Sequence, residues 1–235
     1  NGIKKGYPIT TITGLAYTRN KNGDILIGQT SGLPITDSDW TVLGDRNPKL
    51  NYGVTTNLSY KGFRLSAMLS GMAGATVVNG TMRTMMSKGQ SWESVRLREN
   101  RHYVFEGVLQ DGFENSDNPT KNTVAVDMWK YAGTSIFGGN DEDWLEKDVN
   151  YLKLAEVRLS YAVPSGWLKK ATKGFIPRAS IFVSANDLCT FTNYSGVDPV
   201  GNTMSAAGGG TGGQGYDVWG IPAPRTYSFG VNLSF

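Results

Sequence analysis

The chain has 235 residues, a net charge of +3, a single cysteine and a mean hydropathy of −0.30. One cysteine excludes an internal disulfide framework and a cysteine-rich metal site, and the weak, scattered positive charge gives no sign of a nucleic-acid-binding surface. No run approaches the ~18 apolar residues of a spanning helix, although the strands of a membrane β-barrel escape that test because only alternate residues are apolar. Because the chain starts at Asn1 with neither an initiator Met nor a signal peptide, we expect a processed product, a fragment or the C-terminal part of a longer protein.

The first third of the chain predicts three strands. Residues 8–19 are rich in Thr and Ile and predict a strand. Residues 20–47 predict a loop that could hold a short hairpin around residues 25–27. Residues 50–60 and 63–70 alternate apolar and polar positions on either side of Lys61-Gly62, which is the strongest hairpin signal in the chain.

The remainder predicts three more strands between long connections. Residues 73–147 are polar and poorly periodic, with a short helix expected from Ser91 to Arg101 and a weak strand signal from Val124 to Tyr131. Strands are expected over residues 148–163 and 177–189. Between them, a turn with a helical bend contains Trp167, which we interpret as an anchor at a membrane interface.

The last strand has one apolar face, formed by Tyr227, Phe229, Val231, Leu233 and Phe235. The other face carries only small or polar residues, since side chains alternate along a strand. A soluble β-sandwich strand could have this pattern. An outer-membrane barrel requires it, with apolar side chains toward lipid and polar ones toward the lumen.

Six strands with alternating short and long connections predict part of a barrel. If the last strand ends in the periplasm, every long connection falls outside and every short one inside, as single-chain bacterial barrels require. Six strands cannot close a membrane barrel, whose minimum is about eight, and an open edge cannot stand in lipid. We therefore expect other sequence to supply the rest of the barrel.

The chain resembles the C-terminal quarter or so of a SusC/RagA-type TonB-dependent outer-membrane transporter. The matching stretches, in family order, are Leu43 to Gly53 ("LGnxxPkxxxG"), Leu58 to Leu65 ("YKgFdLs"), Tyr151 to Pro164 ("YlrLrnvxLsYxlP"), Ser184 to Pro199 ("sgqNLxtxTxYxGxDPE") and Pro224 to Phe235 ("PRtyxfGxnlxF"). Two positions depart from the family pattern. Val200 stands where Glu is usual, and Asp187 interrupts an Asn-Leu pair.

The resemblance implies an all-β fold, in which residues 1–235 are the last ~6 antiparallel strands of a 22-stranded transmembrane barrel with long extracellular loops. It implies import of oligosaccharides, in glycan nutrient uptake, across the outer membrane of a Gram-negative bacterium. The implied partners are the rest of the barrel and its plug, TonB, a SusD-like lipoprotein lid and the outer-membrane assembly machinery. That machinery would read the C-terminal face that ends in Phe235. The plug and the TonB-contacting segment are not in this sequence.

Other interpretations remain open. The same mechanism could import peptides, a passive porin-like barrel would need neither plug nor TonB, and a soluble β-sandwich binding module would need no membrane. We expect no cofactor and no enzymatic activity, because the sequence has no catalytic constellation. His102 is the only histidine, and no Gly-x-Ser-x-Gly nucleophile elbow is present. Cys189 is expected to be unreactive.

Two further motifs predict loops, and five tryptophans are candidate contacts. The run Gly208 to Gly213 lacks the ending of a phosphate-binding loop. The acidic cluster Asp141-Glu142-Asp143 lacks calcium-loop spacing and is expected to be solvated. Aromatic faces bury sugar or peptide area at low entropy cost, so the tryptophans in the predicted outer loops could contact substrate or lid: Trp40, Trp92, Trp129, Trp144 and Trp219.

Overall fold

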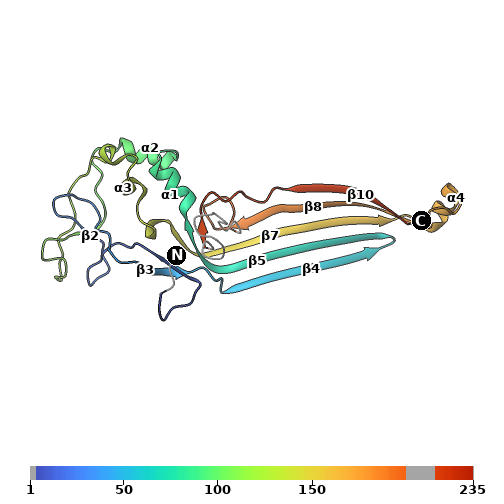
Figure 1. Cartoon of the computed structure of the whole chain (residues 1–235), viewed down its shortest axis with the longest axis horizontal. Helices are drawn as coiled ribbons and strands as arrows, with labels where there is room; N and C mark the ends of the chain where they lie inside the picture. Colours follow the sequence, from blue (N-terminus) through green and yellow to red (C-terminus); the bar gives the residue numbers. More distant parts are fainter. Residues whose placement is uncertain (1–3, 200–214, 235) are drawn as a thin grey trace. The chain divides into compact units, whose positions relative to one another are not determined.

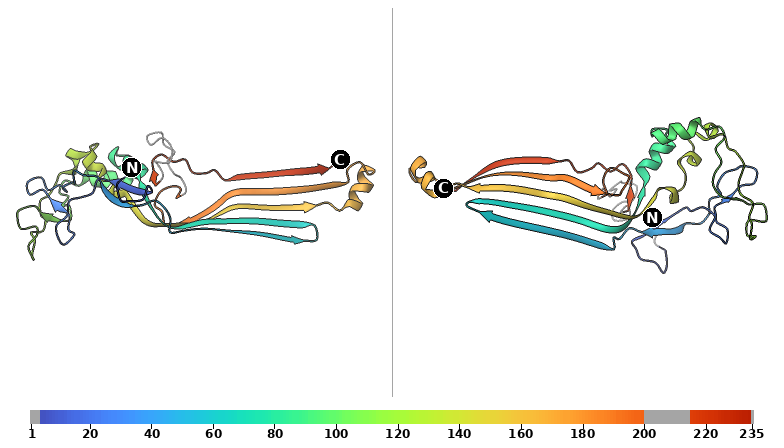
Figure 2. Two further views of the ribbon diagram at one scale, coloured as in Figure 1. Left: turned by 60° about the horizontal axis from the view of Figure 1, so that its bottom comes forward. Right: turned by 180° about the vertical axis from the view of Figure 1, so that it is seen from behind.

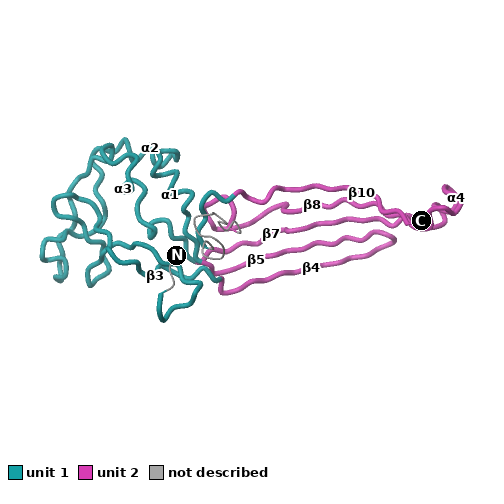
Figure 3. The backbone as a smooth tube through the Cα atoms, in the orientation of Figure 1, with its two compact units in different colours: residues 1–47, 76–147, 202–220 teal, residues 48–75, 148–201, 221–235 magenta. Residues whose placement is uncertain are grey.

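The computed structural model describes residues 4–199 and 215–234. The chain divides into two compact units, each formed from separate stretches of sequence (Figure 3). Unit 1 consists of residues 1–47, 76–147 and 202–220, and unit 2 of residues 48–75, 148–201 and 221–235. Within the described part of the chain, no helix has the length and apolarity needed to cross a membrane.

Unit 2 is built on a sheet of five long strands in the order β10-β8-β7-β5-β4 (Figure 1). The strands are β4 (Leu50–Tyr60), β5 (Phe63–Asn79), β7 (Leu145–Ala162), β8 (Arg178–Thr192) and β10 (Thr226–Ser234). The pairs β4–β5, β7–β8 and β8–β10 are antiparallel. Long strands that follow one another in a sheet are the expected form of a barrel wall, so the all-β prediction is confirmed.

The two short connections of this sheet have the predicted form. Lys61 and Gly62 both have positive φ, 45° and 87°, as a two-residue hairpin turn requires. Tyr60 pairs directly with Phe63 across that turn. Between β7 and β8, Pro164 precedes the helix α4 (Ser165–Thr172), and Lys173 ends it with φ 51°. Both turns lie at the same end of the sheet, and α4 projects past that end (Figures 1 and 2).

The strand predicted over residues 8–19 is wrong as a barrel strand. Only β1 (Thr11–Gly14) forms, and it pairs with β3 (Thr41–Asp45) in a separate two-stranded sheet of unit 1. All of β1 is buried, with Ile12 0% exposed, so it has no face left for lipid. The sixth strand of the long sheet is instead β9 (Tyr216–Asp217), which pairs parallel with the end of β5.

Most of the stretches expected to be loops fold into unit 1, although residues 73–79 extend β5 instead. The predicted helix is confirmed as α2 (Trp92–Glu99), capped by the Ser91 side chain, and α1 (Gly80–Ser87) precedes it. The predicted strand at residues 124–131 is wrong, because only Val126 forms a bridge and the 3-10 helix η1 (Met128–Tyr131) follows. Residues 25–27 do pair, through β2 (Leu26–Ile27) with β6 (Val108–Leu109) and through an antiparallel bridge from Ile27 to Pro34.

Unit 1 has an apolar core of its own. Val126, Met128 and Phe137 are buried at its centre. Partly buried apolar side chains from four separate stretches pack around them: Leu33, Leu97, Tyr103, Phe105 and Tyr131. Phe137 comes from the short helix α3 (Ser135–Gly138), which is followed by the 3-10 helix η2 (Glu142–Trp144). Side chains that bury one another across long connections stabilise an ordered fold where the sequence shows little periodicity.

Candidate functional site

The long sheet has one apolar face that is open to its surroundings. Across β7, β8 and β10, directly opposite residues share a face, and Leu159, Val183 and Phe229 form one such row. Their exposed fractions are 46%, 59% and 89%. The next row is Tyr161, Ile181 and Val231, and the Tyr161 ring lies 4.5 Å from that of Phe63 on β5. Such a surface suits lipid, since a soluble protein rarely exposes so large an apolar patch.

The opposite face of the sheet is polar. It carries hydroxyl and amide side chains that pair across the strands: Asn57 with Ser66, Arg158 with Ser184 and Ser228, and Asn186 with Thr226. Ser160 Oγ donates to the Arg64 carbonyl, 3.5 Å away on β5. This face suits water and polar solutes, as the lumen side of a barrel wall does.

Phe182 breaks the polar face and was missed by the sequence analysis. Its ring lies over Gly230, where an added Cβ would come within 2.7 Å of the ring. The Arg158 guanidinium lies 3.9 Å from the ring centroid, within the range of a cation–π contact. A glycine facing an aromatic in the neighbouring strand is the signal that could have found this packing.

Asp187 forms a β-bulge in β8. Opposite β7, the pairing jumps from Cys189 to Asn186, and Asp187 has a φ of 54°. An extra residue in left-handed conformation is the usual construction of a bulge. The Asp187 carboxylate forms an ion pair with Lys153, which lies on the otherwise apolar side of β7. Asp187, which departs from the family pattern, therefore forms an ion pair with Lys153 on this side of the sheet.

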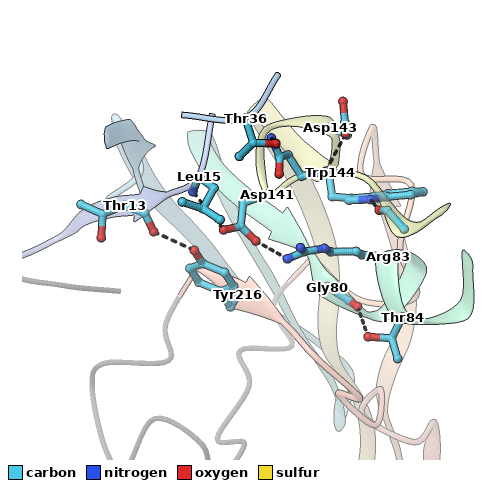
Figure 4. A network of polar contacts seen from close by, with 12 residues as sticks. Thr13, Leu15, Thr36, Gly80, Arg83, Thr84, Asp141, Asp143, Trp144 and Tyr216 are labelled. Carbon is cyan, nitrogen blue, oxygen red and sulfur yellow. Dashed lines mark hydrogen bonds and ion pairs between the residues drawn. The ribbon is translucent and has the colours of Figure 1, made fainter. Parts of the chain in front are cut away.

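In unit 1 the acidic turn is partly solvated, with Asp143 exposed, but its carboxylates are also hydrogen-bonded, which the sequence did not predict. Asp141 Oδ2 accepts from the Leu15 amide at 3.3 Å, and Glu142 Oε2 accepts from the Tyr17 amide at 2.9 Å. Asp143 accepts from the Tyr17 hydroxyl. Gly14 allows this approach, because a Cβ there would lie 2.6 Å from Asp141 Oδ2. The three carboxylates hold the N-terminal stretch to the segment before β7, and Figure 4 shows Asp141 beside Leu15.

An arginine and a tyrosine complete this network. Arg83 on α1 forms an ion pair and hydrogen bond with Asp141, and Tyr216 donates to the Thr13 carbonyl at 3.0 Å (Figure 4). Burial, with a smaller contribution from the Asp141 charge, raises the pKa of Tyr216 to about 12. Burial and the bond to Asp143 likewise raise the pKa of Tyr17. Both phenols therefore stay neutral donors, and the network joins four segments of unit 1.

Two adjoining cavities lie beside this network in unit 1. One, of about 280 Å³, is lined by both apolar and polar groups, among them Leu33, Phe105 and Arg83. The other, of about 510 Å³, lies next to the apolar core and is lined by Met128, Phe137 and Trp144, among others. Both share Tyr17 and Ile136. Their mixed lining would suit a small amphipathic group, but it contains no nucleophile with a paired base.

The five candidate tryptophans all belong to unit 1 but do not converge on one pocket. Trp144 lines the larger cavity, and its indole N–H donates to the Gly138 carbonyl at 2.7 Å. The other four are more than half exposed: Trp40, Trp92, Trp129 and Trp219. Around the Trp129 ring, two guanidinium groups approach the centroid, Arg101 at 4.7 Å and Arg98 at 5.7 Å.

The remaining sequence candidates have simple surroundings. His102 is exposed in unit 1, and Cys189 is half-buried within β8 opposite Leu154. In the described part of the chain, no group of three or more His, Cys, Asp or Glu side chains could hold a metal ion. Four members of the C-terminal face are exposed on β10, namely Tyr227, Phe229, Val231 and Leu233. Phe235 and the run Gly208 to Gly213 lie outside the described residues.

Comparison with known proteins gives relatives along the whole chain. No family model matches. The TonB-dependent receptor P26 of Formosa agariphila is 27% identical over 224 residues, covering 95% of this chain and 20% of that protein. The TonB-dependent receptor P3 of the same organism is 22% identical over 237 residues, covering 100% and 21%. The chain thus spans about a fifth of the length of the curated relatives that it matches.

Solved structures share the fold. The RagAB peptide importer in its open-open state has a TM-score of 0.57 and 19% identity, covering 98% of this chain and 23% of that chain. The closed-closed state gives a TM-score of 0.56 and 18% identity, covering 100% and 25%. These findings confirm the resemblance to SusC/RagA-type TonB-dependent receptors. The two-faced sheet corresponds to part of the barrel of such a transporter.

Proposed function

Because the chain is a barrel segment of a SusC/RagA-type TonB-dependent receptor, we propose that the protein to which it contributes imports oligosaccharides across the outer membrane of a Gram-negative bacterium. In this proposal, residues 1–235 supply part of the barrel wall and its outer loops. TonB supplies energy through a plug encoded elsewhere in the protein, and a SusD-like lipoprotein covers the outer mouth. The protein is a transporter and not an enzyme.

The observation that carries this proposal is the two-faced sheet. Its apolar rows, such as Leu159-Val183-Phe229, are exposed as a lipid-facing wall requires. Its polar face is lined by Ser, Thr and Asn side chains, which can exchange hydrogen bonds with a cargo rich in hydroxyl groups. The edge strands β4 and β10 need partners from the rest of a barrel, because open edges are excluded from lipid.

The exposed tryptophans favour a sugar cargo. Trp40, Trp92, Trp129 and Trp219 offer exposed aromatic faces and lie in the long connections that the sequence pattern assigns to the outer side. Aromatic faces bury the apolar side of a sugar ring while its hydroxyl groups stay wet. We propose that these residues and Trp144 contact cargo or lid. Peptide import is the alternative, favoured by the fold that the chain shares with the RagAB peptide importer.

The test measures uptake by cells that express or lack the full-length protein. Labelled oligosaccharides should accumulate only in cells with the protein, and an uncoupler that collapses the proton-motive force should abolish the uptake. Uptake that survives the uncoupler would favour a passive porin-like barrel. Competition by oligopeptides and not by glycans would favour a peptide importer. Recovery of the folded protein without detergent would instead support a soluble binding module.

A further inference from the structure

The connection between β7 and β8 carries a dense positive charge beside exposed aromatic side chains. Trp167 and Phe175 are 75% and 72% exposed. Four basic residues accompany them: Lys169, Lys170, Lys173 and Arg178. The nearest acidic residues in sequence are Glu156 and Asp187, and no ion pair of these three lysines occurs in the described part of the chain. The turn therefore presents four net positive charges together with two large apolar side chains.

The backbone of this turn is held by its own hydrogen bonds. The Leu168 amide donates to the Pro164 carbonyl at 3.3 Å, which closes the first turn of α4. Thr172 Oγ1 donates to the Leu168 carbonyl at 2.7 Å and accepts from the Ile176 amide at 3.2 Å. Leu168 and Ile176 are half-buried. These bonds fix the backbone from which the lysines and Trp167 project, so that binding requires ordering of side chains but not of the turn itself.

The surroundings of the turn belong to a membrane interface. At the same end of the sheet, Tyr60 and Phe63 flank the other short turn and are exposed. Lys61 Nζ lies 5.2 Å from the centroid of the Tyr60 ring. Aromatic rings and snorkelling lysines gather where a barrel wall leaves the hydrocarbon region. The charged turn thus continues the lipid-facing surface of unit 2.

We propose that α4 and the loop after it form a binding site for anionic phospholipid headgroups. Lys169, Lys170 and Lys173 contact the phosphate groups, while Trp167 and Phe175 enter the boundary between headgroups and acyl chains. A helix with basic residues beside exposed aromatic ones binds anionic lipid surfaces in this way. In the orientation proposed above, the lipids are those of the periplasmic leaflet. The inference rests on the membrane-spanning role of the sheet and is independent of the cargo.

The test compares lipid binding by the full-length protein and two triple variants. The first variant is Lys169→Gln/Lys170→Gln/Lys173→Gln, and the control is Lys88→Gln/Lys121→Gln/Lys130→Gln, which removes the same charge from exposed positions of unit 1. Detergent-purified protein is titrated with phosphatidylglycerol or with phosphatidylcholine, and bound lipid is counted by native mass spectrometry. We expect the preference for phosphatidylglycerol to fall about fivefold for each lysine removed from the α4 turn. The control should retain it.

Two results would overturn the proposal. One is an unchanged preference in the α4 variant, and the other is an equal loss in both variants, which would reflect net charge alone. A second measurement follows the tryptophan fluorescence lost in Trp167→Phe, in vesicles whose acyl chains carry bromine near the headgroup. We expect bromine to quench this difference signal, and an unquenched signal would place Trp167 in water. Loss of cargo uptake with lipid binding intact would count against the proposed function and not against this site.

Discussion

Arginine substitutions on β4 can distinguish the lipid-facing side of the sheet from its polar side. They also report how deep each position lies in the membrane. Val54 and Leu58 are on the same apolar face, and their exposed fractions are nearly equal, 59% and 60%. Thr55 is also exposed but points to the other face. None of the three packs in a core. Arginine at each position therefore probes the surroundings of the sheet rather than its packing.

The expected costs follow from distance to the turn after Tyr60. Val54 lies six residues from Tyr60, about 20 Å along the strand at ~3.3 Å per residue, or ~15 Å in depth for a strand tilted by about 40°. That is near the middle of an apolar band ~25 Å tall, so Val54→Arg should cost ~2–4 kcal/mol. Leu58, two residues from Tyr60, lies only ~5 Å deep, so Leu58→Arg should cost at most ~1 kcal/mol. Thr55→Arg should be near neutral.

The assay is the denaturant midpoint of the folded, heat-modifiable form of the full-length protein in lipid vesicles. The expected order of destabilisation is Val54→Arg, then Leu58→Arg, then Thr55→Arg. Equal losses at all three positions would mean that neither face nor depth matters, and the strand would not cross a bilayer. A larger loss for Thr55→Arg than for Val54→Arg would reverse the assignment of the two faces.

Four further outcomes are expected. Leu159→Arg, at about the depth of Leu58, should cost up to ~1 kcal/mol in the same assay, while Ser160→Arg is tolerated. Equal effects of the two substitutions would contradict the assignment of the two faces. Asp141→Asn removes the partner of the partly buried Arg83 and should loosen unit 1 by ~1–3 kcal/mol, seen as faster proteolysis there with unchanged β10 protection. The isolated 235-residue chain should not fold in lipid, because its edge strands stay unpaired, and a heat-modifiable band would contradict this. Deleting Phe235 should lower the amount of full-length protein in the outer membrane far more than its melting temperature, whereas normal abundance would refute an assembly signal.

The sequence by itself determined the long strands and their two faces. Alternation with a period of two, turn residues such as Lys61-Gly62 and the proline after β7 all act within a few residues of the chain. They predicted β4, β5, β7, β8 and β10, and they assigned Leu159 and Phe229 to the apolar side. The resemblance to transporter barrels rests on the same local patterns, kept in order along the chain.

Only the tertiary structure decided what the irregular stretches do. Residues 8–19 predict a strand, yet only residues 11–14 form one, and it is buried against β3, because the partner of a strand is chosen by distant contacts. The acidic turn at Asp141 is hydrogen-bonded to the N-terminal stretch, whose residues are more than a hundred positions away in the sequence. The Asp187 bulge and the stacking of Arg158 on Phe182 likewise depend on which strands are adjacent. Period and turn chemistry are local properties that a sequence displays, whereas burial and ion pairing depend on which distant segments meet, and those contacts exist only in the folded chain.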